Sequence, residues 1–300
     1  MTDQAPKTPL FRGAATALVT PMRDGAPDFE ALSHLIERQI EGGIDALVVT
    51  GTTGEAATLS ERERRDVVRF CAATVRGRVP LIAGTGSPST HAAVRLSCEA
   101  AAAGADGLLV VTPYYNKPTS AGMLAHYGEI ARAAELPVIV YHVPARTGTR
   151  LSPEDYAALS RIPGVAGIKE AGAPPAEVAR TLALLGGEIP LYSGNDEECL
   201  PHLALGAEGI ISVVSNLFPG EVASLCRRAR EGKWEEARRL FYRLLPFSRL
   251  MFVESNPIPV KAALSLLGLC HSEVRLPLSE ATEMTKRALA RALDAWEGEK

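Results

Sequence analysis

The sequence predicts an α/β protein with the (β/α)8 TIM barrel fold and a C-terminal helical extension. Eight short runs rich in β-branched residues recur along the chain. Their starts lie roughly 20 to 35 residues apart, which is the spacing of parallel strands joined by helical crossovers. Several runs are apolar on both faces, as buried parallel strands are. An open doubly wound sheet is disfavoured, because no glycine-rich dinucleotide-binding sequence follows the first run.

The predicted strands share a short length and a β-branched composition. They span residues 14–20, 44–50, 80–83, 107–111, 137–141, 165–169, 190–193 and 209–214. The segments between them carry helix signals. Ser60 and Glu63 form the pattern of a capping box, and Ser152 is a predicted N-cap. Paired glycines at positions 42–43 and 186–187 are expected to end helices before the next strand.

The barrel is expected to close near Asn216, and only helical patterns follow it. These patterns span residues 219–231, 233–250, 257–267 and 279–296. About 80 residues exceed what one closing helix needs at a rise of ~1.5 Å per residue. We therefore predict an N-terminal arm over residues 1–12, a barrel over residues 13–232 and a C-terminal helical domain over residues 233–300.

The composition narrows the possible partners. Hydrophobic residues make up 46% and charged residues 22% of the 300 residues, as in an average globular protein. The 32 basic and 35 acidic residues give a net charge of -3, which argues against nucleic acid or an anionic membrane as a partner. No apolar run approaches the roughly 20 residues needed to span a bilayer. The first ten residues lack a signal-peptide pattern, so we expect a cytoplasmic protein.

The cysteines indicate the same compartment. Their number is odd, no two form a CxxC pair, and each lies in a segment with a helical pattern: Cys71, Cys98, Cys199, Cys226 and Cys270. We expect reduced, buried thiols rather than a disulfide framework or a zinc site.

Lys169 is the most informative candidate site residue. It ends the sixth predicted strand, and alternation places it on the same face as Gly167. In a barrel interior a lysine is costly, and burial lowers its pKa. A neutral amine there can attack a carbonyl and form a Schiff base. A lysine that points to water, or that pairs with Glu170, is the alternative, and the strand pattern alone does not separate the two.

Tyr141 ends the neighbouring strand and supports the catalytic interpretation. A phenol near an amine can carry protons during imine formation and carbon-acid chemistry. A tyrosine packed in the core is the alternative for Tyr141 alone. His142 alternates to the opposite face, so we expect it to pack against the helical layer.

Two loops offer groups that bind carboxylates. Thr52 and Thr53 supply hydroxyls and backbone N–H groups in a tight turn, and Arg146 follows Tyr141 on a loop. An ordinary turn and a surface arginine are the alternatives. No His/Glu pair has the spacing of a metal site, and no nucleophile-elbow or phosphate-loop motif is present. The sequence therefore predicts no metal and no cofactor.

Six sequence blocks together resemble the dihydrodipicolinate synthase family, a group of imine-forming (class I) aldolases that includes N-acetylneuraminate lyase. They are GTTGEAATL (51–59), VTPYYNKP (111–118), YHVPARTG (141–148), GIKEA (167–171), SGND (193–196) and ESNPIPVK (254–261). The resemblance implies a (β/α)8 barrel with a C-terminal helical domain and a homotetramer. It also implies condensation of pyruvate with L-aspartate 4-semialdehyde to 4-hydroxy-tetrahydrodipicolinate, in lysine and diaminopimelate biosynthesis.

The resemblance implies a role for each matching catalytic residue. Lys169 would form the imine with pyruvate, and Tyr141 would carry the proton. Thr52 and Tyr115 would complete the proton relay, with Tyr115 reaching in from a neighbouring subunit.

The resemblance also implies the residues that bind the substrates. Thr53 would hold the pyruvate carboxylate and Arg146 the semialdehyde carboxylate, while Gly194 and Ile211 would line the pocket. A related pyruvate-dependent aldolase, of the N-acetylneuraminate lyase or 2-keto-3-deoxy-sugar type, is the alternative activity. A catalytically silent keto-acid-binding protein is a third possibility.

The chain departs from the family pattern at several positions. His142 stands where asparagine is common, and Ala56 where serine is common. Pro88 and Ala92 stand where members inhibited by lysine carry an amide and a carboxylate. We therefore expect weak or absent inhibition by lysine.

Overall fold

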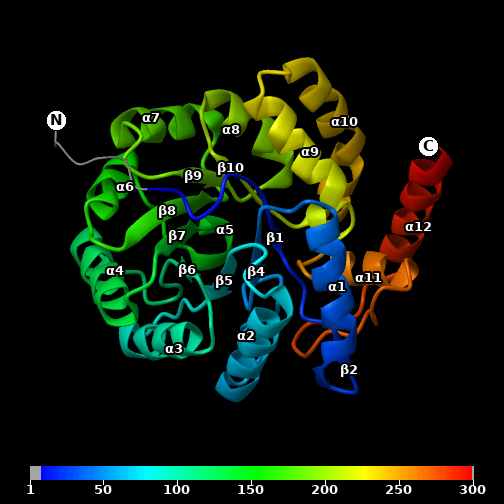
Figure 1. The fold of residues 1–300 in the computed structure, drawn as a ribbon, viewed down its shortest axis with the longest axis horizontal. Coiled ribbons are helices and arrows are strands. Elements are labelled where there is room, and N and C mark those ends of the chain that lie inside the picture. Colours follow the sequence, from blue (N-terminus) through cyan, green and yellow to red (C-terminus); the bar gives the residue numbers. More distant parts are fainter. Residues whose placement is uncertain (1–7, 299–300) are drawn as a thin grey trace.

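The computed structural model describes residues 8–298, and in this part of the chain eight parallel strands close into a barrel (Figure 1). They are β1 (Gly13–Ala17), β4 (Ala46–Val49), β5 (Leu81–Gly84), β6 (Gly107–Val111), β7 (Val138–His142), β8 (Val165–Glu170), β9 (Leu191–Ser193) and β10 (Gly209–Ser212). Strands adjacent in this order pair with one another, and β1 pairs with β10 to close the barrel. The predicted barrel is confirmed, and all eight strands lie where the sequence predicted them to within a few residues.

A short antiparallel hairpin of β2 (Met22–Arg23) and β3 (Ala26–Pro27) follows β1 and was not predicted. Its strands have two residues each, so they leave no periodic pattern. Asp24 and Gly25 form the turn at positive φ.

Helices cover the outside of the barrel (Figure 1). They are α1 (Phe29–Glu41), α2 (Glu61–Val75), α3 (Thr90–Ala102), α4 (Ser120–Ala134), α6 (Pro153–Ser160), α7 (Pro175–Leu185), α8 (Cys199–Leu205) and α9 (Pro219–Arg230). The short helix α5 (Pro144–Thr147) instead lies at the C-terminal end of β7. The 3-10 helices η1 (Asp196–Glu198) and η2 (Val214–Asn216) follow β9 and β10. The predicted capping boxes are present at Ser60 and Ser152, and Gly186 ends α7 in the left-handed conformation.

The C-terminal extension consists of α10 (Trp234–Leu250), α11 (Ile258–Leu266) and α12 (Glu283–Gly298). Trp296 of α12 packs on Phe218 and Phe247, with ring centroids 4.2 and 5.6 Å away. The predicted boundary at residues 232–233 falls in the turn between α9 and α10, and the domain division stays a prediction. Part of the predicted arm, residues 1–7, lies outside the described residues. None of the helices described could cross a membrane.

The barrel interior is filled at one end. Phe11 stacks on the Tyr192 ring at 4.2 Å, and the Tyr192 hydroxyl donates a hydrogen bond to the Phe11 carbonyl at 2.8 Å. Both side chains belong to the apolar cluster inside the barrel, which also contains Ile211 and Tyr141. The predicted closure near Asn216 is also present, because its side chain bonds the backbone of Ala17 and Val19.

The cysteine prediction is partly wrong. All five thiols are free, and Cys71, Cys199 and Cys226 are buried as expected. Cys98 is exposed, because it lies on the outer face of α3 while Leu96 and Ser97 face inward. Cys270 is half-buried and lies beyond the end of α11, so it is not in a helix.

Candidate active site

Lys169 lies inside the barrel, beside Tyr141. The two residues are partners in the register of β7 and β8, and the Lys169 Nζ lies 4.2 Å from the centroid of the Tyr141 ring. Only 5% of Lys169 is exposed. Burial lowers its pKa to about 8; Asp196 opposes this shift and the charge of Arg146 adds to it. A substantial fraction of the amine is therefore neutral and nucleophilic near pH 8.

Tyr141 is also buried, and it contacts both the amine and the open cavity described below. Burial raises the pKa of Tyr141, while Arg146 and a hydrogen bond with Thr52 act in the opposite direction. The phenol therefore stays protonated at neutral pH and has Thr52 as a partner for proton exchange.

Gly194 follows the C-terminal end of β9, and Ile211 lies on β10. A Cβ atom at Gly194 would lie 2.9 Å from the Lys169 Cε and 2.8 Å from the Ala171 Cβ. Glycine therefore leaves the space that the lysine side chain occupies. Ile211 is fully buried on β10, within the same interior cluster as Tyr141.

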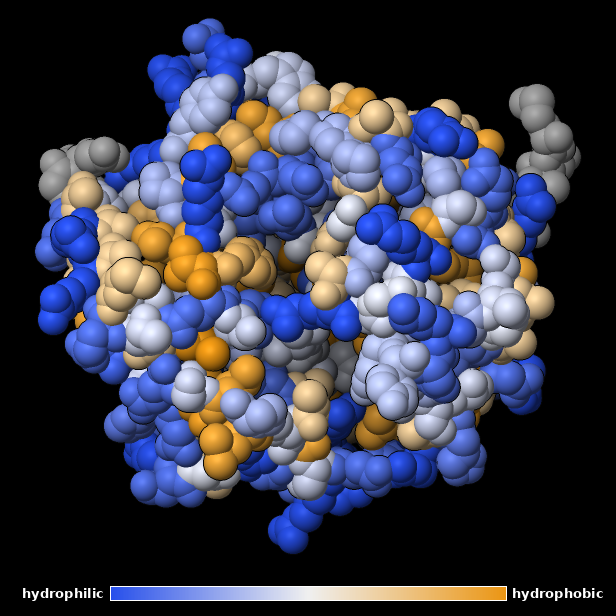
Figure 2. Space-filling view, turned by 180° about the vertical axis from the view of Figure 1, so that it is seen from behind, coloured by the Kyte–Doolittle hydropathy of each residue, from blue (hydrophilic) through white to orange (hydrophobic). Residues whose placement is uncertain are grey.

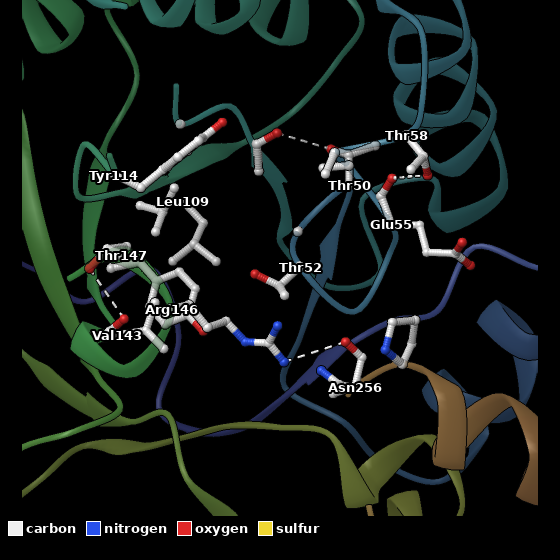
Figure 3. A pocket seen from close by; sticks show the side chains of 18 of the residues that line it. Thr50, Thr52, Glu55, Thr58, Leu109, Tyr114, Val143, Arg146, Thr147 and Asn256 are labelled. Carbon is white, nitrogen blue, oxygen red and sulfur yellow. Dashed lines mark hydrogen bonds between the residues drawn. The ribbon is translucent and has the colours of Figure 1, made fainter. Parts of the chain in front are cut away.

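A cavity of about 320 Å³ opens above these residues at the C-terminal ends of the strands (Figure 3). Thr52, Tyr141 and Arg146 line it, as do Tyr114 of the β6–α4 loop and Asn256 of the C-terminal extension. Figure 3 shows the side chains of Thr52 and Arg146 reaching into the same open space. The cavity thus combines a hydroxyl, a phenol and a guanidinium within an otherwise largely apolar wall.

Of the eight predicted site residues, Thr52, Tyr141 and Arg146 line this cavity, and five do not: Lys169, Gly194, Ile211, Thr53 and Tyr115. The Thr53 hydroxyl is buried and accepts a hydrogen bond from Asn256 Nδ2 at 2.9 Å. Tyr115 lies on the β6–α4 loop with 95% of its surface exposed and a φ of 68°. Within one copy of the chain, Tyr115 is therefore not part of the cavity wall that Thr52 and Tyr141 share.

Glu170 does not pair with Lys169, and that alternative is wrong. The Glu170 carboxylate faces the helical layer and accepts hydrogen bonds from His142 Nδ1 at 2.9 Å, the Tyr156 hydroxyl and the backbone N–H of Ala173. Burial alone would raise the Glu170 pKa, but these bonds hold it below its usual value. The predicted orientation of His142 is confirmed.

Sequence reasoning missed a buried ion pair next to the cavity. Lys261 of α11 lies 2.5 Å from the Glu55 carboxylate in the β4–α2 loop, and both side chains are at most 1% exposed. The available signal was a lone lysine within the apolar run of α11, which requires an acidic partner when buried. Among residues 8–298, no cluster of His, Cys, Asp and Glu could hold a metal ion.

The model of the dihydrodipicolinate synthetase family matches residues 10–296. The chain belongs to this family. It is 48% identical over 286 residues to the 4-hydroxy-tetrahydrodipicolinate synthase of Nitratidesulfovibrio vulgaris (strain DP4), covering 95% of this chain and 98% of that protein. The predicted resemblance and the predicted enzyme class, a lyase, are confirmed.

Solved structures of the family have the same fold. A dihydrodipicolinate synthase from Acinetobacter baumannii, described as chloride inhibited and complexed with pyruvate, matches with a TM-score of 0.93 and 41% identity, over 95% of this chain and 99% of that one. A structure described as the first monomeric variant of the enzyme matches with a TM-score of 0.94 and 41% identity, over 96% and 97% of the two chains. These relatives favour the synthase over the aldolase alternative.

Proposed function

We propose that this chain condenses pyruvate with L-aspartate 4-semialdehyde to 4-hydroxy-tetrahydrodipicolinate through an imine on Lys169. The observation that carries the proposal is a buried amine with a pKa of about 8, placed 4.2 Å from the ring centroid of Tyr141. The pyruvate complex of the Acinetobacter baumannii relative supports the choice of the first substrate.

The amine of Lys169 attacks the pyruvate ketone, and loss of water gives the imine. The cationic imine nitrogen then accepts electrons, so a proton leaves the pyruvate methyl group and an enamine forms. The enamine carbon attacks the aldehyde of the second substrate. The amino group of that substrate then attacks the imine carbon and displaces the Lys169 amine as the ring closes, which releases the product. Tyr141 carries the protons in these steps, because its hydroxyl bonds Thr52 and its ring contacts the lysine. Thr52 passes protons on to Tyr115 of a second copy.

Each of the two carboxylates has its own proposed binding residue. The Thr53 hydroxyl accepts its bond from Asn256, so its own proton remains available for the pyruvate carboxylate. Arg146 reaches into the cavity and binds the carboxylate of the semialdehyde bidentately. Gly194 leaves space beside the amine, and Ile211 supplies an apolar wall.

We propose a homotetramer located in the cytoplasm. The exposed phenol of Tyr115 supports assembly, since it lies outside the cavity wall of its own chain and is accessible to a second copy. Apolar patches lie between the charged side chains on the face in Figure 2. Large exposed apolar residues of the described chain include Phe252, Val253, Leu276 and Met284.

We also propose that lysine inhibits weakly or not at all, as expected from Pro88 and Ala92.

Condensation of pyruvate with aspartate semialdehyde tests the proposal. The wild type should turn over, and Lys169→Ala should lose nearly all turnover while keeping its melting temperature. Borohydride reduction with pyruvate should add mass to the Lys169 peptide of the wild type. Cleavage of N-acetylneuraminate or a keto-deoxy sugar, without condensation, would overturn the proposal in favour of an aldolase. A wild type without any adduct would overturn the imine.

A further inference from the structure

The buried ion pair between Glu55 and Lys261 joins two parts of the chain that are distant in sequence. Glu55 lies in the β4–α2 loop and Lys261 in α11 of the C-terminal extension. The second oxygen of Glu55 accepts a hydrogen bond from the backbone N–H of Arg275 at 2.9 Å. Both carboxylate oxygens are thus held by residues of the extension.

Stability alone does not account for this pair. Burying two charges costs much of what their attraction returns, and apolar residues of similar volume often stabilise a core equally well. Both Thr50 and Glu55 have positive φ values, 49° and 55°, although neither is glycine. Strained backbone of this kind persists where the surroundings over-determine it, and it is concentrated at functional sites.

The strained loop carries Thr52, and Glu55 is bonded to it directly. The backbone N–H of Glu55 donates to the Thr52 carbonyl at 3.1 Å. Figure 3 shows the Glu55 side chain turned away from Thr52. The backbone N–H of Glu55 therefore holds Thr52, while Lys261 and the Arg275 backbone hold the Glu55 carboxylate.

The extension holds the same loop at two further points. Asn256 Nδ2 bonds the Thr53 hydroxyl at 2.9 Å, and Arg275 Nη1 bonds the Thr58 carbonyl at 2.9 Å. Of these three attachments, only the one at Glu55 joins two fully buried charged side chains.

We propose that Lys261 is a positioning residue: through its buried pair with Glu55, the C-terminal extension fixes the loop that presents Thr52 to Tyr141. The inference rests on the proposed function, because it assigns the loop a part in that proton relay. This role of Lys261 would make the C-terminal extension part of the active site.

The double variant Glu55→Gln/Lys261→Met tests this role without leaving an uncompensated buried charge. We expect its melting temperature to stay near that of the wild type and its kcat to fall about tenfold or more, the size of effect that a small misplacement causes. The yield of borohydride-trapped pyruvate adduct should not change, since Lys169 is intact. Arg249→Met is the matched control: it breaks the exposed pair with Glu197, which also joins the extension to the barrel, and should leave kcat unchanged.

A pH profile separates positioning from a structural role. The hydrogen bond from Thr52 lowers the pKa of the Tyr141 phenol. A more mobile Thr52 weakens this bond and raises that pKa, so the alkaline limb of the kcat profile should move to higher pH. A stable double variant with wild-type kcat and pH profile would overturn the inference. If the double variant does not fold, Lys261→Met alone carries the same test, because the Glu55 carboxyl group keeps the hydrogen bond from the Arg275 backbone and can take up a proton. Failure of this variant to fold would likewise assign the pair to stability. A wild type that forms no adduct contradicts the proposed function instead.

Discussion

Burying the side chains of Lys169 and Tyr141 side by side costs free energy, because both groups can be charged. Loss of hydration disfavours the ammonium of the lysine and the phenolate of the tyrosine. The same burial leaves both groups in the protonation states that imine chemistry needs, a partly neutral amine and a protonated phenol. At this scale the site is a product of desolvation; at Lys169 the charge of Asp196 opposes the shift of the pKa, and the charge of Arg146 adds to it.

The rate of imine formation should rise with pH, reach half its maximum near pH 8 and level off about one pH unit above that. The neutral amine is the nucleophile, and the Lys169 pKa of about 8 sets the midpoint. Borohydride trapping of the pyruvate adduct after short incubations at a series of pH values measures this rate. A midpoint close to 10.5, the ordinary value for lysine, would contradict the buried environment.

Tyr141→Phe should lower kcat on the order of 100-fold or more, because a general acid–base group is lost while the ring remains. The melting temperature should change little, since the phenyl ring keeps its contacts in the barrel interior. Steady-state condensation kinetics provide the measurement. A variant with nearly full kcat would remove Tyr141 from the proton relay.

At the scale of elements, the ends of β7 and β8 carry the proposed reacting groups on one face and are joined by hydrogen bonds on the other. His142 and Glu170 follow Tyr141 and Lys169 directly and form a buried hydrogen bond. Leu151 N–H donates to His142 Nε2 at 3.2 Å, so the ring proton resides on Nδ1, where it is donated to Glu170. The hydrogen bonds of His142 and Glu170 therefore fix the spacing between the C-terminal ends of β7 and β8.

Glu170→Leu should lower the free energy of unfolding by about 3 kcal/mol, because several buried donors lose their acceptor. Glu170→Gln keeps one acceptor oxygen and should cost less. Urea unfolding at pH 7 measures both variants.

The pH dependence of unfolding checks the same interaction. The folded structure lowers the Glu170 pKa, so this stabilisation is present above its ordinary value of 4.5 and is lost as the pH falls through the lowered pKa. Between pH 7 and the acid range, the wild type should lose more stability than Glu170→Gln. Parallel losses in the two proteins would contradict this assignment.

At the scale of the whole molecule, the barrel is filled at one end and open at the other. The Phe11–Tyr192 stack fills the interior near the N-terminal arm, and the cavity opens at the C-terminal ends of the strands. The extension reaches this open end through Asn256 and Lys261, whereas Tyr115 points to solvent. In the described part of one chain, Lys169 and Tyr141 therefore lie side by side and Thr52 and Arg146 line the cavity, whereas Tyr115 does not.

Two inactive variants should restore activity when their subunits exchange. Tyr115→Phe retains Lys169, and Lys169→Ala retains Tyr115, so a mixed pair of copies regains one complete site. Random exchange between symmetric pairs should recover about a quarter of wild-type activity. Condensation assays after mild dissociation and reassembly measure the recovery. No recovery, with mixed oligomers demonstrated by mass spectrometry, would exclude sharing of Tyr115.

The sequence alone determined the barrel, the positions of its strands and the candidate pair Lys169 and Tyr141. These follow from local periodicity, capping signals and the rule that strand ends of a parallel barrel meet at one face. The hairpin after β1 and the exposure of Cys98 were decided by contacts that leave no periodic trace. Only the tertiary structure revealed the pairing of Glu55 with Lys261, because the two residues lie 206 positions apart and no local pattern records which buried charges meet.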